Sequence, residues 1–190
     1  MAKSLKLVRL AIALTLAVSM LFAFGCAKKP VEIIIYTDFG CGDCAQLHFT
    51  VETELLRQYV NTGKAEFKIY LLAGLGTDSV RAAQAALCAN EQGRFWEYRD
   101  AILTAFFQIG LAAYSDEELL KVADELSLDK ESFIACLNNT AILEKLEQNM
   151  SQSQAAGIDQ VPTVIINGVK VVGVEPLETY VKIIEEQLAK

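Results

Sequence analysis

The sequence contains a single histidine, His48, and this scarcity limits the metal sites that the chain can build. A closed structural zinc site needs four ligands, and the cysteines outside the pair Cys41 and Cys44 lie far away in the sequence. Cys41, Cys44 and His48 lie at positions i, i+3 and i+7, on one face of a predicted helix. These three residues could form only an open three-ligand site for copper(I) or zinc. Metal binding at this site is therefore an alternative hypothesis for the segment.

Basic residues are also few: the 190 residues include 17 Lys and Arg against 24 Asp and Glu. Without residues 1–25, which carry three basic and no acidic side chains, 14 basic residues face 24 acidic ones, a net charge of −10. This balance argues against nucleic acid as a partner. The chain also lacks internal repeats and low-complexity tracts, and its length suits one globular domain.

The apolar run at the start of the chain is shorter than the roughly 20 residues that a membrane-spanning helix needs. Leu10–Phe24 contains fifteen residues and follows the basic residues Lys3, Lys6 and Arg9. This pattern predicts an export signal in residues 1–25. An uncleaved membrane anchor is the alternative.

The run ends in Ala23-Phe24-Gly25-Cys26, which resembles the lipobox of bacterial lipoproteins. The resemblance implies that Cys26 becomes the lipid-modified first residue of the mature protein. Ala23 stands where leucine is usual, and Phe24 is bulky for its position. The alternative is an ordinary signal or an anchor in which Cys26 is incidental. With a lipid on Cys26, only a very short segment would separate the membrane from the folded domain.

The first part of the folded domain, residues 26–76, is predicted to be a β-α-β unit. Val31–Tyr36 is almost continuously apolar and β-branched, which indicates a central strand buried on both faces. Between Asp43 and Tyr59 apolar residues recur every three or four positions, which predicts a helix of about five turns. Ala65–Leu72 alternates between apolar and polar residues and is expected to form a second strand, parallel to the first.

Residues 77–156 show helical patterns and no strand signal, so we expect a helical insertion. Ser115 and Asp129 stand at positions suited to helix N-caps. In residues 157–190, two short apolar strands flank Asn167-Gly168, a strong hairpin signal. Pro176 then opens a last helix. The predicted order is therefore β-α-β, a helical insertion, and β-β-α.

Cys41-Gly42-Asp43-Cys44 follows the first predicted strand and precedes a helix, which indicates a dithiol redox site. Two cysteines at this spacing place both sulfurs at the helix N-terminus, where backbone N–H groups and the helix dipole favour a thiolate. A thiolate attacks disulfides, and a second sulfur within reach resolves the resulting mixed disulfide.

Cys88 and Cys136 remain after the cysteines of the leader and the motif are assigned. Export implies an oxidising compartment, in which this pair can form a structural disulfide. The alternative is two separate buried thiols, because both residues lie in helical patterns rich in alanine and leucine.

The motif and its surroundings resemble the thioredoxin superfamily, and within it the DsbA-like thiol oxidoreductases, over nearly all of residues 31–190. The resemblance lies in residues 38–44, 81–96 and 157–168. It implies an α/β thioredoxin fold with an inserted all-helical subdomain between the βαβ and ββα halves. It also implies that Cys41 is the exposed nucleophile and Cys44 the resolving thiol. The Val161–Pro162 bond is then expected to be cis and to pack against the Cys41 sulfur, with the Val161 backbone free to pair with an extended substrate.

Four positions depart from or qualify this family pattern. Asp43 stands where oxidising relatives often have histidine or tyrosine, and its charge would raise the pKa of Cys41 and make the couple less oxidising. Ile35 occupies the place of the buried acid of thioredoxins, so no general acid or base is transferred. Asp38 is expected to cap or turn the loop, and His48 to pack or hydrogen-bond on its helix.

The sequence therefore predicts an extracytoplasmic, membrane-tethered thiol–disulfide oxidoreductase that acts on exported polypeptides, for example in the periplasm. Oxidation is the favoured direction, with isomerisation or reduction as the alternative. No cofactor is expected. A quinone-linked reoxidant or an electron donor in the membrane is the expected redox partner. A thioredoxin-fold binding module in which Cys41 and Cys44 form a fixed staple is a further alternative.

Overall fold

The computed structural model describes residues 29–190, so the predicted leader and Cys26 lie outside the described residues. A four-stranded sheet organises the unit formed by residues 31–190, with the strand order β2-β1-β3-β4. Strand β1 pairs in parallel with β2 and antiparallel with β3, which in turn pairs antiparallel with β4. The interior position of β1 confirms the prediction made from its apolar sequence. The strands are β1 (Val31–Asp38), β2 (Ala65–Leu72), β3 (Thr163–Ile166) and β4 (Val169–Val172).

The helix predicted after β1 is present, but its backbone changes character along its length. It comprises α2 (Gly42–Leu47), the π-helical segment η1 (His48–Glu52), α3 (Thr53–Leu55) and a second π-helical segment, η2 (Leu56–Val60). The apolar period did not indicate the π-helical segments. Such segments widen a helix locally and often occur near functional sites.

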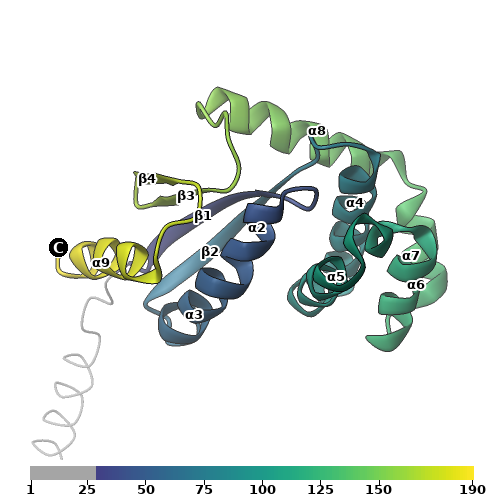
Figure 1. Cartoon of the computed structure of the whole chain (residues 1–190), viewed down its shortest axis with the longest axis horizontal. Helices are drawn as coiled ribbons and strands as arrows, with labels where there is room; N and C mark the ends of the chain where they lie inside the picture. The colour runs from purple at the N-terminus through teal and green to yellow at the C-terminus, as the bar shows by residue number, and fades with distance from the viewer. Residues whose placement is uncertain (1–28) are drawn as a thin grey trace, which may run out of the picture. The chain divides into compact units, whose positions relative to one another are not determined.

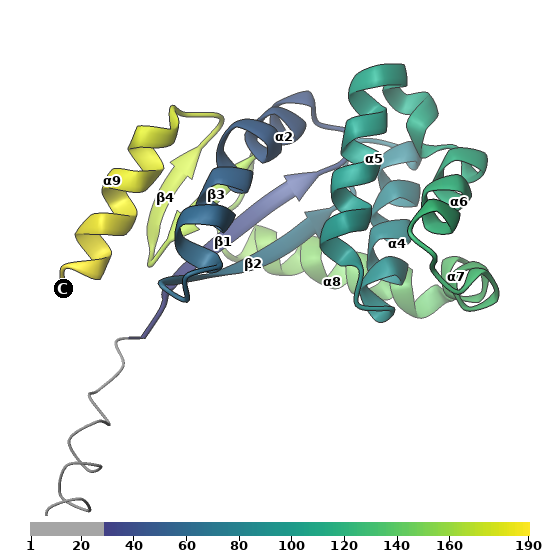
Figure 2. The same ribbon diagram turned by 90° about the horizontal axis from the view of Figure 1, so that it is seen from below.

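Helices cover both faces of the sheet, as Figures 1 and 2 show. The helix of residues 42–60 and α9 (Leu177–Leu188) lie on one face, and α8 (Thr140–Ala155) lies on the other. On the first face, β1 contributes Ile33 and Ile35 to an apolar cluster that includes Leu47 and Ile184. Pro176 is the N-cap of α9 and directly precedes its first residue, Leu177, so it opens the last helix as predicted.

The segment between β2 and β3 is helical, as predicted, and gives the thioredoxin fold its inserted subdomain. Its apolar core is rich in alanine, excludes water from the helix interfaces, and also includes Phe39, Ala45 and Leu71 from outside the insertion. Ser115 and Asp129 cap two of its helices through their side chains. Its elements before α8 are α4 (Thr77–Glu91), α5 (Phe95–Ile109), the 3₁₀ turn η3 (Gly110–Tyr114), α6 (Asp116–Glu125) and α7 (Lys130–Leu137).

A disulfide joins two helices of this insertion. Cys88 of α4 and Cys136 of α7 have their sulfurs 2.02 Å apart and their Cα atoms 5.7 Å apart. Both side chains are buried in the insertion core. The alternative of two separate thiols is therefore not what the structure contains.

No helix in residues 29–190 is both long enough and apolar enough to cross a membrane.

Candidate active site

Cys41 is the N-cap residue of α2, so its position follows from the way the helix begins. Its sulfur accepts a hydrogen bond from the Cys44 backbone N–H at 3.1 Å. Cys41 is partly exposed, whereas Cys44 lies one turn further along and is buried. Both are free cysteines. The local fold thus presents one sulfur to solvent and keeps the second directly behind it.

The surroundings of Cys41 favour its thiolate. The pKa of the Cys41 thiol is lowered to about 7, first by a hydrogen bond from the Cys44 side chain and further by the Cys44 backbone N–H. Partial burial and the negative charges of Asp43 and Asp38 act in the opposite direction. The effect of Asp43 has the sign predicted from the sequence. A substantial fraction of Cys41 is therefore nucleophilic near neutral pH.

Cys44 has the opposite electrostatic environment. Its pKa is raised, first because its thiol is hydrogen-bonded to Cys41 and then because it is buried. Hydrogen bonds from the Asp38 backbone and the Thr37 side chain offset part of this increase. Cys44 thus holds its proton while Cys41 gives up its own, and this division suits a nucleophile with a resolving partner.

The loop before β3 brings a distant segment to the Cys41 sulfur. The Val161–Pro162 peptide bond is cis. The Cys41 thiol donates to the Val161 carbonyl oxygen at a sulfur–oxygen distance of 3.7 Å, across 120 residues of sequence. The antiparallel pairing of β1 with β3 accounts for this approach, because it carries the start of β3 to the end of β1.

Asp38 holds the loop that carries Cys41, a larger role than the cap or turn expected from the sequence. Its buried carboxylate accepts hydrogen bonds from the backbone N–H groups of Gly40 at 2.8 Å and Gly74 at 2.9 Å. The Ser79 hydroxyl donates to the same carboxylate. One side chain therefore ties the loop before Cys41 to the loop after β2 and to helix α4. The sequence spacing did not indicate Gly74 and Ser79 as its partners.

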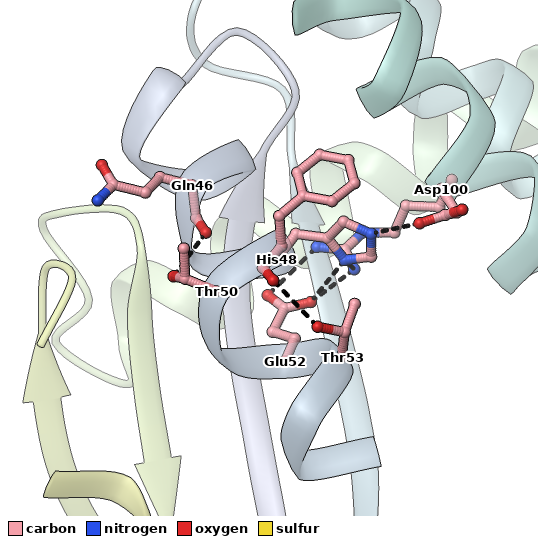
Figure 3. A network of polar contacts seen from close by, with 8 residues as sticks. Gln46, His48, Thr50, Glu52, Thr53 and Asp100 are labelled. Atoms are coloured by element: carbon pink, nitrogen blue, oxygen red, sulfur yellow. Dashed lines mark hydrogen bonds and ion pairs between the residues drawn. The ribbon is translucent and has the colours of Figure 1, made fainter. Parts of the chain in front are cut away.

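His48 is buried and lies between the buried Glu52 and the exposed Asp100 (Figure 3). Arg99 of α5 lies 2.8 Å from the His48 Nδ1 atom and donates to Glu52 at 2.6 Å. Since a guanidinium only donates, Nδ1 acts as an acceptor and Nε2 donates to Asp100 at 3.0 Å. Arg99 and Glu52 are almost fully buried, and opposite charges of this kind must be paired inside a protein. The cluster ties the helix of the cysteines to the insertion.

The contacts of His48 argue against the alternative that Cys41, Cys44 and His48 bind a metal ion. Both ring nitrogens of His48 face the charged cluster. Within residues 29–190, no three histidine, cysteine or acidic side chains lie close enough together to hold a metal ion. Ile35, at the place of the buried acid of thioredoxins, is fully buried and apolar. The site therefore consists of two sulfurs, the Val161 backbone and the loop that Asp38 holds.

Comparison with known proteins now places the chain in a family. A family model described as Thioredoxin matches residues 19–186. The chain belongs to the thioredoxin family. The solved structure of α-DsbA1 from Wolbachia pipientis matches it with a TM-score of 0.74 at 22% identity, covering 87% of this chain and 89% of that one. BdbD from Bacillus subtilis matches with a TM-score of 0.72 at 18% identity, covering 87% and 91%. This thioredoxin-family chain therefore has the fold of DsbA-like proteins, with the helical insertion that the sequence predicted.

Curated relatives differ widely in length. "Probable disulfide bond formation protein D" of Bacillus anthracis is 27% identical over 150 residues, which cover 77% of this chain and 69% of the relative. An Na(+)/H(+) antiporter NhaA of Herminiimonas arsenicoxydans is 31% identical over 166 residues, which cover 85% of this chain but 24% of the antiporter. The chain thus spans about a quarter of the length of that relative.

Proposed function

We propose that this protein is a thiol–disulfide oxidoreductase of exported polypeptides, with Cys41 as nucleophile and Cys44 as resolving thiol. In the oxidising direction, a substrate thiolate attacks the Cys41 sulfur of the Cys41–Cys44 disulfide, and Cys44 leaves and takes up a proton. A second substrate thiolate then attacks the substrate sulfur of the mixed disulfide and releases Cys41. The substrate dithiol is oxidised to a disulfide, and the protein disulfide is reduced to a dithiol.

The observation that carries this proposal is the asymmetry of the two sulfurs. Cys41 is partly exposed, with a pKa of about 7, and Cys44 is buried behind it with a raised pKa. A disulfide that serves only as a fixed structural cross-link needs no difference in exposure or pKa between its two cysteines. The Val161 carbonyl beside Cys41 supplies a backbone group with which an extended substrate can pair.

The proposed location and redox partner of the protein are inferred from the predicted leader sequence. An export signal in residues 1–25 followed by Cys26 supports a lipid-tethered protein in an extracytoplasmic compartment, where exported chains acquire disulfides. In the oxidising direction, a quinone-linked membrane protein would reoxidise the dithiol. The mass of the membrane-bound native protein tests the tether: a mature chain that begins at Cys26 and carries a lipid would support it, and an intact leader would favour an uncleaved anchor.

A second candidate, isomerase or reductase, is favoured by one observation. The Cys41 pKa of about 7 matches the value of about 7 typical of thioredoxin rather than the value of about 3.5 typical of DsbA. Asp43 and Asp38 contribute to this difference by opposing the thiolate. We therefore expect a redox potential nearer to the roughly −180 to −270 mV of disulfide isomerase and thioredoxin than to the roughly −120 mV of DsbA. Equilibration with glutathione measures it, and a value at or above that of DsbA would contradict the expectation.

Substrate trapping tests the activity itself. The Cys44→Ala variant retains the nucleophile but cannot resolve, so it should accumulate mixed disulfides with extracytoplasmic proteins. The Cys41→Ser variant should form none and should lose at least about 10³-fold in the oxidation of a reduced, unfolded protein. A native Cys41–Cys44 pair that stays oxidised in strong thiol buffer, together with a Cys44→Ala variant that traps nothing, would favour the staple.

A further inference from the structure

We infer that a pocket on the α8 face of the sheet binds the side chain next to the target cysteine of the substrate, and that it selects an apolar side chain. This inference rests on the proposed function and adds a substrate preference to it. The pocket has a volume of about 560 Å³, within the range of roughly 300–1,000 Å³ usual for ligand sites. Its walls come from the loop after β2, the C-terminal part of α8 and residues 157–161.

The pocket adjoins the residue whose carbonyl oxygen contacts the reacting sulfur. Val161 lines it, and the Val161 carbonyl oxygen lies 3.7 Å from the Cys41 sulfur. Leu75 also lines it and packs so closely on Gly40 that a Cβ atom there would lie 2.9 Å from the Leu75 Cβ. Two of its walls therefore flank the loop that presents Cys41.

The position of the pocket fits the geometry of an extended substrate. The cysteine helix covers one face of the sheet, and α8 lies on the other (Figures 1 and 2). Met150, Ser153 and Gln154 of α8 line the pocket. Successive side chains of an extended segment point to opposite sides. A segment paired with the Val161 backbone that directs its cysteine to Cys41 would therefore direct the adjacent side chain to the α8 face, where the pocket lies.

The chemistry of the walls favours an apolar occupant. Leu72, Met150, Ile158 and Val161 belong to one apolar cluster on this face. The buried polar groups of the pocket have partners within the protein: Asp38 accepts its three hydrogen bonds, and Ser153 donates to the Asn149 carbonyl at 2.7 Å. An apolar side chain leaves these bonds intact, whereas an acidic one would meet the carboxylates of Asp38 and Asp159. The flexible Met150 side chain suits a site that accepts several apolar shapes.

Gly74 offers a way to fill the pocket. A Cβ atom there would lie 3.4 Å from the Met150 Cε atom, so an added side chain points into the cavity at an ordinary contact distance. The Gly74 N–H that bonds Asp38 is retained in a Gly74→Leu variant. Gln148→Leu is the matched control, because it adds the same side chain at an exposed position of α8 outside the pocket.

The experiment measures the second-order rate constant for reduction of the Cys41–Cys44 disulfide by short cysteine peptides that carry Leu, Phe, Gly or Asp directly before or directly after the cysteine. In this reaction two peptide thiols give up two electrons and form a peptide disulfide. For one of these two positions, the native protein and Gln148→Leu should prefer Leu or Phe over Gly by about tenfold, as burial of one such side chain allows. Gly74→Leu should lose the preference. Met150→Ala, which enlarges the pocket, should shift it from Leu towards Phe.

Reduction of each variant by dithiothreitol, which has no side chain to bind, serves as the reference reaction. Each peptide rate is divided by the dithiothreitol rate of the same variant, so that a change in the loop held by Asp38 is not counted as a change in side-chain preference. Gln148→Leu should react with dithiothreitol at the native rate. A native protein with no preference at either position, or a preference that survives in Gly74→Leu, overturns the inference while leaving the proposed function standing. Failure of the native Cys41–Cys44 disulfide to react with either peptide or dithiothreitol would instead refute the proposed function.

Discussion

The protein contains two cysteine pairs with opposite environments. Cys41 and Cys44 are three residues apart at a helix start, remain free, and leave one sulfur partly exposed. Cys88 and Cys136 are 48 residues apart on two packed helices, are bonded, and are both buried. Reactivity thus follows from access and from hydrogen bonds that favour a thiolate, and the presence of two nearby sulfurs is not enough.

The two cysteine pairs also lie in different parts of the molecule, one in the part built around the sheet and the other in the helical insertion, and these two parts have different roles. The sheet and the cysteine helix present a reactive sulfur to solvent, whereas the insertion uses its sulfurs to join α4 and α7. The Arg99–Glu52 ion pair connects the two halves. Changes to one cysteine pair should therefore leave the properties of the other pair intact, and this separation can be tested from both sides.

The largest expected effect is on the stability of the insertion. Replacing both Cys88 and Cys136 with alanine removes a cross-link over 48 residues, for which the loop-entropy model gives about 4 kcal/mol, or roughly 10³-fold in the folding equilibrium. Urea unfolding of the native and double-variant proteins measures the difference. The pH profile of Cys41 alkylation should be the same in both. A double variant as stable as the native protein would show that the disulfide contributes nothing to the free energy of unfolding.

The next effect concerns the pH dependence of Cys41 in the reduced protein. Because the thiolate is the reactive form and the pKa is about 7, the fraction of thiolate falls with decreasing pH. Alkylation by iodoacetamide at pH 5 should be about 100-fold slower than on the plateau at high pH. Cys88 and Cys136 should stay unlabelled throughout.

The Cys44→Ala variant sharpens this experiment. It removes the side-chain hydrogen bond that contributes most to lowering the Cys41 pKa but keeps the backbone N–H of residue 44. The midpoint of the alkylation profile should therefore move to higher pH. An unchanged midpoint would mean that the helix N-terminus alone sets the acidity of Cys41.

Much of the fold and site could be predicted from the sequence, because the signals were local. The apolar run of β1, the Asn-Gly turn and the helix caps each depend on a few neighbouring residues. The resemblance then linked Val161–Pro162 to Cys41 across the sheet. The partners of Asp38 and the Arg99–Glu52 pair could not be found in this way. These contacts depend on how the insertion packs against the rest of the protein. From the sequence alone, a charged residue in a helical pattern is predicted to be exposed to solvent, because most charged residues are.

The smallest expected effect comes from the charge of Asp43, which lies between the two reactive cysteines in the sequence. Asp43 is exposed and raises the pKa of Cys41, so Asp43→Asn should lower that pKa and speed alkylation at pH 6 by about twofold to threefold. The exposed Asp124→Asn, on the insertion, serves as the matched control and should change nothing. Because salt screens exposed charges, the difference between native and Asp43→Asn should shrink in about 1 M salt. A difference that persists there would mean that Asp43 acts through the conformation of the helix start rather than through its charge.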